Sequence, residues 1–392
     1  MFIIALIVAV ASYAVVMSTY LLYIALVLRN SKIKEYVRLT KQIVTKPLAH
    51  EELPSVTAII PMYNEEPIIA KKLQNLAELD YPIEKIEVLL VDDCSTDRTC
   101  EIAENTINKL RLNGIIIKNP QRLGANASYN IGVTSASSDL ILRTDADIMV
   151  NPDALQKAVQ IILNIENLGG VTGMMDPVFD ITTTATTMEK KYRNLFDKMS
   201  IAESALHSTY PGGGGFTLIK KSVYSPIPIN QGSTDANISL SMIRKGFRHI
   251  FVAETFCLEL VSRGLKEQMR QKARRARRLI QSTVNNKEFL FNKEYREFGM
   301  VIFPLRFAMF VICPFLVFAG ILSTFYLLFS YSLFLAVTLG VGAFLVLYAG
   351  TRTKISSLNS VTSVLAQQFY LLLGLFLLPK KNGTWNSIKR TK

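Results

Sequence analysis

The sequence has little of what histidine- or cysteine-based chemistry requires. Its 392 residues contain only three histidines and four cysteines. The histidines do not cluster, which argues against a histidine metal site and against a Ser/His/Asp triad. The cysteines lack paired CxxC spacing, so they indicate neither a zinc site nor a disulfide framework. We therefore expect any chemistry to depend on carboxylates.

Charge is absent from two long stretches of the chain, Met1–Leu28 and Phe307–Gly350. As a helix, the first would extend about 42 Å, more than the roughly 30 Å of a bilayer core. The second is long enough for two crossings of about 20 residues each. We expect an N-terminal transmembrane anchor over residues 1–28 and membrane segments over residues 299–379. Within the latter, residues 355–379 form either a third span or an interface helix, because both flanks are basic.

Much of the net charge of +13 lies beside these apolar runs. A basic linker spans residues 29–53, a basic amphipathic region spans residues 266–298, and a basic tail spans residues 380–392. Basic flanks normally stay in the cytoplasm. We therefore expect a protein integral to the cell membrane, with residues 54–265 as its cytoplasmic domain. The expected partners of this charge include membrane lipids, and no nucleic acid.

Apolar, β-branched runs alternate with helical patterns inside residues 54–265. The predicted strands are residues 56–60, 86–91, 115–118 and 140–143. This alternation predicts an α/β fold with a doubly wound, mostly parallel sheet. Ligands of such sheets collect beyond the carboxyl ends of the strands. Three of the four strands end in acidic segments, which contain Glu65, Asp92-Asp93 and Asp145-Ala146-Asp147.

The Asp145-Ala146-Asp147 segment is a candidate metal site. An extended i, i+2 pair can place both carboxylates on one side of the backbone. Mn²⁺ and Mg²⁺ prefer hard oxygen ligands, commonly one or two carboxylates together with phosphate oxygens. Surface turns are also rich in aspartate, so a purely structural turn is the alternative. The position directly after an apolar strand favours the metal.

Four sequence motifs, in the order in which they follow one another along the chain, resemble those of family 2 glycosyltransferases. The resemblance is to the membrane-integrated branch in particular, which includes cellulose, chitin and hyaluronan synthases. The resemblance covers residues 54–281. Pro61-Met62-Tyr63-Asn64-Glu65 resembles the family's PxYNE segment, and residues 91–99 resemble its VDDxSxDxT segment. The resemblance implies the A-type nucleotide-sugar glycosyltransferase fold. It also implies a nucleoside diphosphate sugar as donor, which we expect to be UDP-linked.

The resemblance also assigns roles to individual residues. Asp145 and Asp147 match the pair that binds Mn²⁺ or Mg²⁺. The residues implied in donor binding are Pro61, Tyr63, Glu65, Asp92, Asp93, Arg122, Asn130, Asp145, Gln271 and Arg274. The residues implied on the acceptor side are Gly213, Gly214, Gly215, Thr234 and Arg275.

Asp235 is the residue implied to act as general base. Ser233-Thr234-Asp235 precedes a helical pattern and is similar to the family's TED motif, with Thr234 where the family has glutamate. A hydroxyl is a poor nucleophile near neutral pH, so a carboxylate that accepts its proton supplies what the reaction lacks. The resulting single displacement inverts the anomeric centre. The alternative is that Asp235 only caps the following helix.

Gln271-Lys272-Ala273-Arg274-Arg275 occupies the place of the family's QxxRW motif, but the tryptophan is absent. Arg274 offers a planar, charged donor suited to a diphosphate, although a basic helix can also bind anionic lipid headgroups. In processive relatives the tryptophan contributes to the acceptor site, so Arg275 argues against chain elongation. We expect a lipid, lipid-linked or glycan acceptor.

The sequence therefore predicts an inverting membrane glycosyltransferase that uses a nucleotide-activated sugar. A processive polysaccharide synthase that extrudes its polymer is the first alternative. A carrier or channel with a nucleotide-binding module and no catalysis is an alternative of another class.

Overall fold

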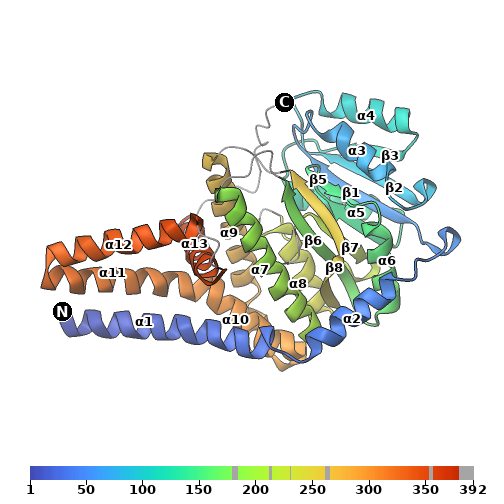
Figure 1. Ribbon diagram of the computed structural model, residues 1–392. Coiled ribbons are helices and arrows are strands. Elements are labelled where there is room, and N and C mark those ends of the chain that lie inside the picture. Colours follow the sequence, from blue (N-terminus) through green and yellow to red (C-terminus); the bar gives the residue numbers. More distant parts are fainter. Residues whose placement is uncertain (179–183, 212–213, 230, 261–264, 353–355, 379–392) are drawn as a thin grey trace.

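A computed structural model describes the chain except for residues 179–183, 212–213, 230, 261–264, 353–355 and 379–392. The chain forms two parts, which Figure 1 shows side by side: a domain around a central sheet, and a group of long helices that extends away from it. Two predicted features, Gly213 and the basic tail at residues 380–392, lie outside the described residues.

The central sheet has eight strands within the described residues, in the order β3-β2-β1-β4-β7-β6-β8-β5. The strands are β1 (Val56–Met62), β2 (Ile86–Asp92), β3 (Asn113–Lys118), β4 (Leu140–Thr144), β5 (Ile148–Val150), β6 (Leu168–Val178), β7 (Phe216–Lys220) and β8 (Arg248–Leu260). Strands β1 to β4 pair in parallel. In the other half, β7 is antiparallel to β4 and β6, and β5 is antiparallel to β8. The sheet is therefore mixed, and the prediction of a mostly parallel sheet describes its first half.

The first half of the sheet has strands and helices close to their predicted positions. Helices α3 (Ile69–Ala77), α4 (Thr99–Leu110) and α5 (Ala125–Ser135) connect successive strands from β1 to β4. Such crossovers are what parallel pairing requires. Strands β1 and β2 are buried along almost their whole length, because elements cover both of their faces.

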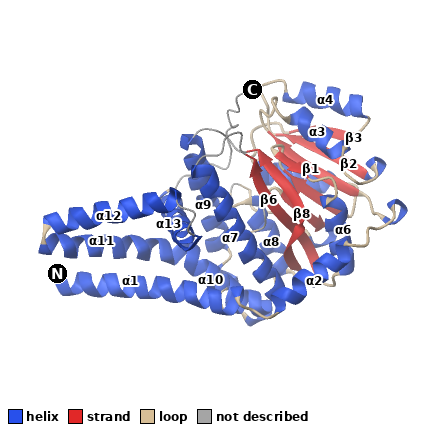
Figure 2. Cartoon of the chain, in the orientation of Figure 1, coloured by secondary structure: helices blue, strands red, loops and turns tan. Residues whose placement is uncertain are grey.

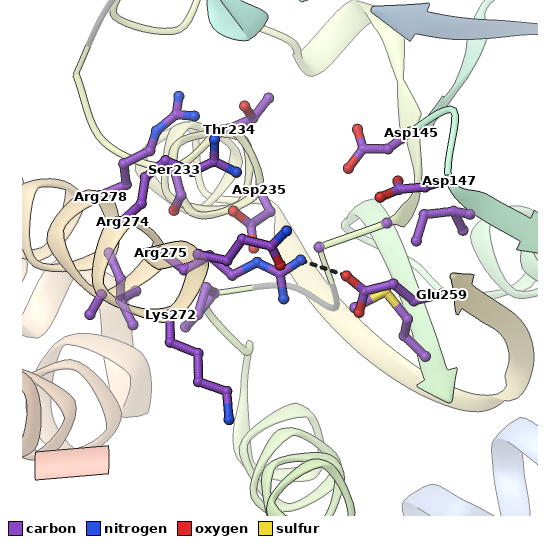
Figure 3. Close-up of a pocket in the computed structure, with 18 of the residues that line it drawn as sticks. Asp145, Asp147, Ser233, Thr234, Asp235, Glu259, Lys272, Arg274, Arg275 and Arg278 are labelled. Carbon is purple, nitrogen blue, oxygen red and sulfur yellow. Dashed lines mark hydrogen bonds and ion pairs between the residues drawn. The ribbon is translucent and has the colours of Figure 1, made fainter. Parts of the chain in front are cut away.

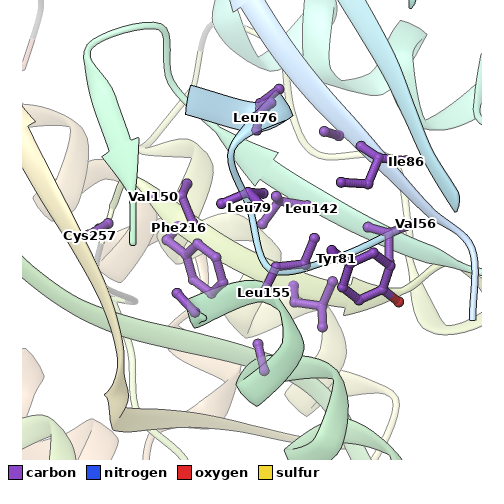
Figure 4. Packing of buried hydrophobic residues seen from close by; sticks show 14 of the residues in the cluster. Val56, Leu76, Leu79, Tyr81, Ile86, Leu142, Val150, Leu155, Phe216 and Cys257 are labelled. Atoms are coloured by element: carbon purple, nitrogen blue, oxygen red, sulfur yellow. The ribbon is translucent and has the colours of Figure 1, made fainter. Parts of the chain in front are cut away.

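Both faces of the sheet are packed. On one face, Leu142 of β4, Phe216 of β7 and Leu155 of α6 (Ala154–Asn164) belong to one buried cluster (Figure 4). On the other face, Val133 of α5 packs with Ile238 of α8 (Thr234–Arg244). This two-sided burial holds the ends of the strands, and hence the loops after them, in fixed positions.

Long apolar helices make up the second part of the chain, and Figure 2 shows that the strands are confined to the sheet domain. Helices α1 (Phe2–Tyr23), α11 (Cys313–Tyr331) and α12 (Leu333–Arg352) lie alongside one another in Figure 1. Among the described residues, two helical stretches could cross a membrane by length and composition alone, Phe2–Leu28 and Phe298–Tyr331. Large apolar side chains on them are exposed, including Ile3 at 71% and Phe325 at 51%.

The last described helix, α13 (Ser356–Phe376), returns to the sheet domain. It packs against α9 (Leu265–Asn285) and α7 (Thr184–Leu206) as well as against α11 and α12. For residues 355–379 the sequence allowed either a third span or an interface helix. In the structure, α13 in this segment lies between the two parts of the chain (Figure 1). Helix α2 (Lys32–Val44) lies along the sheet domain, where the Tyr36 hydroxyl donates a hydrogen bond to the Phe251 carbonyl at 2.6 Å.

A buried ion pair joins the two parts. Glu203 of α7 accepts a hydrogen bond at 2.5 Å from Nε of Arg306, which lies in α10 (Phe303–Phe307). The Tyr23 hydroxyl donates to Glu203 Oε1, and the Thr209 hydroxyl donates to Oε2, both at 2.7 Å. Glu203 and Arg306 are 0% and 1% exposed. Arg306 therefore faces the sheet domain, although it belongs to one of the two apolar stretches.

Candidate active site

The loops after β1 and β2 are bound to each other at the carboxyl edge of the sheet. The Asn64 amide donates to Ser95 Oγ at 3.0 Å, and Asn64 Oδ1 accepts from the Thr96 amide at 2.8 Å. Arg98 and Glu66 form an ion pair at 2.9 Å between the same loops. Asn64 adopts a left-handed backbone conformation with φ of 53°, which asparagine tolerates better than most residues. The PxYNE-like and VDDxSxDxT-like segments therefore form one unit.

Asp93 organises the loop that leads into α5. Its buried carboxylate accepts hydrogen bonds from the backbone amides of Leu123 at 2.7 Å and Gly124 at 3.0 Å. It also pairs with Arg122 Nε at 3.1 Å, and the Arg122 guanidinium lies 3.3 Å from the centroid of the Tyr63 ring. Three predicted donor residues, Tyr63, Asp93 and Arg122, thus form a single stacked and ion-paired group.

The side chains of Asp92 and Asn130 form hydrogen bonds within the protein. Asp92 is 4% exposed, and both its oxygens lie 3.2 Å from the Ser95 amide that donates to them. The Asn130 side chain donates to the Ile227 carbonyl at 2.9 Å and accepts from the Ile227 amide at 3.0 Å. Both side chains hold loops at this edge of the sheet. Their direct contact with a donor stays a prediction.

A pocket of about 430 Å³ opens where the carboxyl edge of the sheet meets α9 and α13 (Figure 3). Its lining includes most of the predicted site residues: Pro61, Glu65, Asp145, Asp147, Gly214, Gly215, Thr234, Asp235, Gln271, Arg274 and Arg275. The predicted donor residues outside its lining are Tyr63, Asp92, Asp93, Arg122 and Asn130. The structure therefore brings the carboxylates after β4 and at the start of α8 into one cleft.

Asp145 and Asp147 lie on the turn between β4 and β5. The Ile148 amide closes this turn by donating to the Asp145 carbonyl at 3.2 Å. Lys72 of α3 holds both sides of the turn, because its Nζ donates to Thr144 Oγ1 at 2.9 Å and to the Ile148 carbonyl at 2.6 Å. Complete burial lowers the pKa of Lys72 to about 7. Lys72 thus holds the turn with the two aspartates in place.

The two carboxylates suit a divalent cation that has further ligands. The Asp145 side chain is 41% exposed, so its oxygens are accessible. In the part of the chain that the structure describes, no group of three or more His, Cys, Asp or Glu side chains could hold a metal ion. Mg²⁺ typically takes one or two carboxylates and completes its octahedron with water and substrate phosphates. The pair Asp145 and Asp147 fits this pattern.

Asp235 lies in the first turn of α8, and Figure 3 shows it between the α9 arginines and the two aspartates. Ser233 is the N-cap residue, and no side-chain capping hydrogen bond forms at this helix end. Asp235 thus does not occupy the capping position that was its alternative role. The Thr234 hydroxyl donates to Asn126 Oδ1 at 2.7 Å, which fixes the start of the helix.

Arginines of α9 form the wall opposite the aspartates. Arg278 donates from Nε to the Gly232 carbonyl at 2.8 Å, and burial lowers its pKa to about 10. Burial also lowers the pKa of Arg274, whereas Asp147 and Asp145 act in the opposite direction. The Arg274 guanidinium therefore lies within the electrostatic field of both acids.

The described part of the glycine loop lies between these walls. Gly214 has φ of +71°, which favours glycine because a Cβ would strain the backbone. At Gly215 a Cβ would lie 2.6 Å from two carbon atoms of the Ile148 side chain. Glycine at these two positions therefore lets the loop approach the Asp145 turn.

Several charged residues of the pocket were not predicted from the sequence. Arg143 of β4 donates from Nη2 to both Asp145 oxygens at 2.9 and 3.0 Å, and it also donates to the Gly214 carbonyl. Burial would raise the pKa of Glu259, but ion pairs with Arg193 and Arg275 lower it to about 2. The only available clue was a charged residue near the end of the otherwise apolar β4 strand.

Comparisons with known proteins relate part of the chain to glycosyltransferases. The family model "Glycosyl transferase family 2" matches residues 57–227. The "Probable glycosyltransferase YdaM" of Bacillus subtilis is 31% identical over 147 residues, which are 37% of this chain and 34% of that protein. A poly-beta-1,6-N-acetyl-D-glucosamine synthase of Staphylococcus aureus is 26% identical over 229 residues, 57% of this chain and 54% of that protein. The chain thus matches between a third and about half of the length of these relatives.

One solved structure resembles almost the whole chain. A mannosyltransferase from Pyrobaculum calidifontis, in complex with GDP-Man and Mn²⁺, has a TM-score of 0.72 and 22% sequence identity. The similarity covers 95% of this chain and 99% of that chain. At this identity the likeness concerns the fold, and it supports the A-type glycosyltransferase architecture with its mixed sheet.

Proposed function

We propose, from the match of residues 57–227 to the family 2 glycosyltransferase model, that the protein transfers a sugar from a nucleoside diphosphate sugar to a membrane-associated acceptor. The transfer inverts the anomeric centre, and the acceptor is a lipid or a lipid-linked molecule. The match supports the resemblance that the motifs indicated. The donor, the metal and the acceptor are the proposed parts.

One observation carries the proposal: Asp145, Asp147, Asp235 and Arg274 line the same pocket. They come from the turn between β4 and β5, from the first turn of α8 and from α9, which are far apart in the sequence. An activated sugar has a charged diphosphate at one end and a reactive anomeric carbon at the other. A pocket with a metal-type aspartate pair, an arginine and a separate carboxylate matches these requirements.

The diphosphate end of the donor is assigned to the Asp145 turn and to α9. Asp145 and Asp147 would hold Mn²⁺ or Mg²⁺, and when bound the cation supplies positive charge to the departing diphosphate. Arg274 contributes a second, permanently charged donor on the opposite wall. The nucleoside is assigned to the unit of Tyr63, Asp93 and Arg122, beside the pocket. A UDP-linked donor remains the prediction from the sequence, and the similar mannosyltransferase with bound GDP-Man makes GDP-sugars the alternative.

The acceptor end is assigned to Asp235. Its carboxylate faces the pocket and is not engaged in a helix-capping hydrogen bond. It can therefore accept the proton of an acceptor hydroxyl while that oxygen forms a bond to the anomeric carbon. General bases of this kind typically contribute roughly 10²–10⁴-fold to the rate.

A membrane location of the acceptor is supported by the position of the pocket. Tyr370 and Leu371 of α13 belong to its lining, next to Lys272 of α9. Helix α13 contacts the apolar helices α11 and α12. A lipid that lies along these helices would present its polar end to the pocket. The basic residues after the N-terminal apolar helix support a cytoplasmic position of the catalytic domain.

The test offers purified protein a panel of UDP- and GDP-sugars with Mn²⁺ and extracted membrane lipids, and identifies products by mass. A lipid that gains one sugar in the presence of one donor is the expected result. The same preparation with Asp147→Asn should lose the product, whereas Asp153→Asn, at the half-buried N-cap of α6, should retain it. Absence of any glycosylated product with every donor would contradict the proposal.

A processive synthase is the second candidate, and the likeness to the poly-beta-1,6-N-acetyl-D-glucosamine synthase along 57% of the chain favours it. Arg275 argues against it, because this residue stands where processive relatives have tryptophan. Its guanidinium is bound to Glu259 at 2.5 Å. A ladder of products that differ by one sugar would establish this candidate, and a single added mass would exclude it.

A further inference from the structure

Arg143 has no role in the proposed reaction, yet its side chain contacts both the turn with Asp145 and the glycine loop. It lies on β4 two residues before Asp145, and its side chain is 8% exposed. Its guanidinium donates to both Asp145 oxygens and, through Nη1, to the carbonyl of Gly214. One buried cation therefore connects the proposed metal turn to the glycine loop.

This contact places a positive charge where the metal is expected. Asp145 is exposed on the pocket side, but its carboxylate is already neutralised by Arg143 from the sheet side. A divalent cation at the same carboxylate would lie close to the guanidinium, whose side chain is almost fully buried. Like charges at such separations repel strongly when the surroundings are partly desolvated. The negative diphosphate of a donor would remove this repulsion.

We propose that Arg143 is an internal counter-ion of Asp145 that makes divalent metal binding conditional on the nucleoside diphosphate. The proposal rests on the assignment of Asp145 and Asp147 as metal ligands under the proposed function. It predicts positive coupling: metal and nucleotide each raise the affinity for the other by the same factor, because linkage between two binding sites is reciprocal. Couplings between sites commonly reach roughly 5–150-fold.

The experiment measures Mn²⁺ binding by electron paramagnetic resonance on the purified full chain, alone and with saturating UDP or GDP. The wild type is expected to bind Mn²⁺ weakly alone and at least about tenfold more tightly with one of the nucleotides. Arg143→Gln removes the charge and keeps an amide that can donate to Gly214. It should bind Mn²⁺ alone about tenfold more tightly than the wild type, and the nucleotide should add little.

Two further variants make the result specific. Arg143→Lys keeps the positive charge and should retain the wild-type coupling. Arg248→Gln controls for the loss of a partly buried arginine, because Arg248 donates to the carbonyls of His207 and Ser204, which do not line the pocket. It should leave Mn²⁺ binding and its coupling unchanged. If Arg143→Gln fails to fold, as judged by thermal unfolding, Mn²⁺ binding by the wild type with and without nucleotide still tests the predicted coupling.

Two outcomes would overturn the proposal. One is wild-type protein that binds Mn²⁺ equally well with and without nucleotide. The other is an Arg143→Gln protein that binds Mn²⁺ alone no more tightly than the wild type. The variant Asp147→Asn separates this failure from failure of the proposed function. If Asp147→Asn binds Mn²⁺ normally, the assignment of the metal site is wrong, whatever Arg143 does.

Discussion

The buried Lys72 should make the stability of the protein depend on pH in a way that can be measured without substrate. Burial of Lys72 lowers its pKa from 10.5 to about 7 in the folded chain. In the unfolded chain the side chain is in water and titrates near its ordinary pKa of about 10.4. Between these two values, the unfolded chain binds one more proton than the folded chain. The free energy of unfolding therefore rises with pH through this window and loses this contribution as pH falls through about 7.

The size of the effect follows from the same pKa values. Each pH unit inside the window changes the free energy of unfolding by about 1.4 kcal/mol. From pH 7 to pH 9 the gain is about 2 kcal/mol, because the folded lysine is still half protonated at the lower pH. For a domain of this size, that gain corresponds to roughly 4–8 °C in melting temperature. Lys72→Met removes the titrating group, so the variant should lack this increase.

The assay is thermal unfolding of detergent-solubilised wild type and Lys72→Met at pH 7, 8 and 9, in EDTA and without donor. The melting temperature of the wild type should rise relative to that of the variant as the pH increases. Lys109→Met, at an exposed position of α4, controls for the loss of one lysine. Wild-type and Lys72→Met curves that stay parallel from pH 7 to pH 9 would refute the buried, deprotonating lysine.

Three further outcomes test other parts of the structure. Glu203→Gln leaves Arg306 buried without its counter-ion and should lower the free energy of unfolding by roughly 3–5 kcal/mol, measured by thermal or denaturant unfolding. Gly132→Ala would place a Cβ 2.5 Å from Ile59 Cγ2, and this overpacking should cost roughly 1–3 kcal/mol in the same assay with Mn²⁺ binding unchanged. Asp93→Asn weakens the charged acceptor for the loop before α5 and should reduce nucleotide affinity by roughly tenfold, measured by calorimetry; unchanged affinity would separate that loop from the donor site.

The half of the sheet that contains β1 to β4 could be predicted from the sequence. Strands β1, β2 and β4 are short apolar runs, and each is followed directly by acids. Periodicity is sufficient for such elements, because both faces of a parallel strand are buried and its helix follows at once. The placement of Glu65, Asp145 and Asp147 in one pocket follows from this topology.

The second half of the sheet could not be predicted in the same way. Strand β7 pairs antiparallel with β4. Phe216 of β7 lies opposite Thr144 of β4 in this pairing, although the two residues are far apart in the sequence. Pairing of this kind is decided by tertiary packing and leaves no local pattern. The contacts of Arg143 and Lys72 were missed for the same reason, since a charged residue in a strand or helix usually indicates an exposed face.

Some predictions are confirmed and others remain open. The prediction of family 2 motifs agrees with the family model that matches residues 57–227, and the A-type fold is supported by the similar mannosyltransferase. The sequence also left open whether Asp235 caps a helix, and the structure assigns the N-cap position to Ser233 instead. The nucleotide, the metal, the acceptor and the membrane topology stay predictions, because they depend on molecules other than this chain.

The central claim is that Asp235 removes the acceptor proton in the pocket that also holds the donor at Asp145 and Asp147. The most direct test measures sugar transfer and donor binding for Asp235→Asn, with the donor and acceptor identified by the panel. Donor and Mn²⁺ affinities of Asp235→Asn should stay within about twofold of the wild type, whereas its transfer rate should fall by roughly 10²–10⁴-fold. Transfer at the wild-type rate by Asp235→Asn would contradict the role of Asp235 as general base.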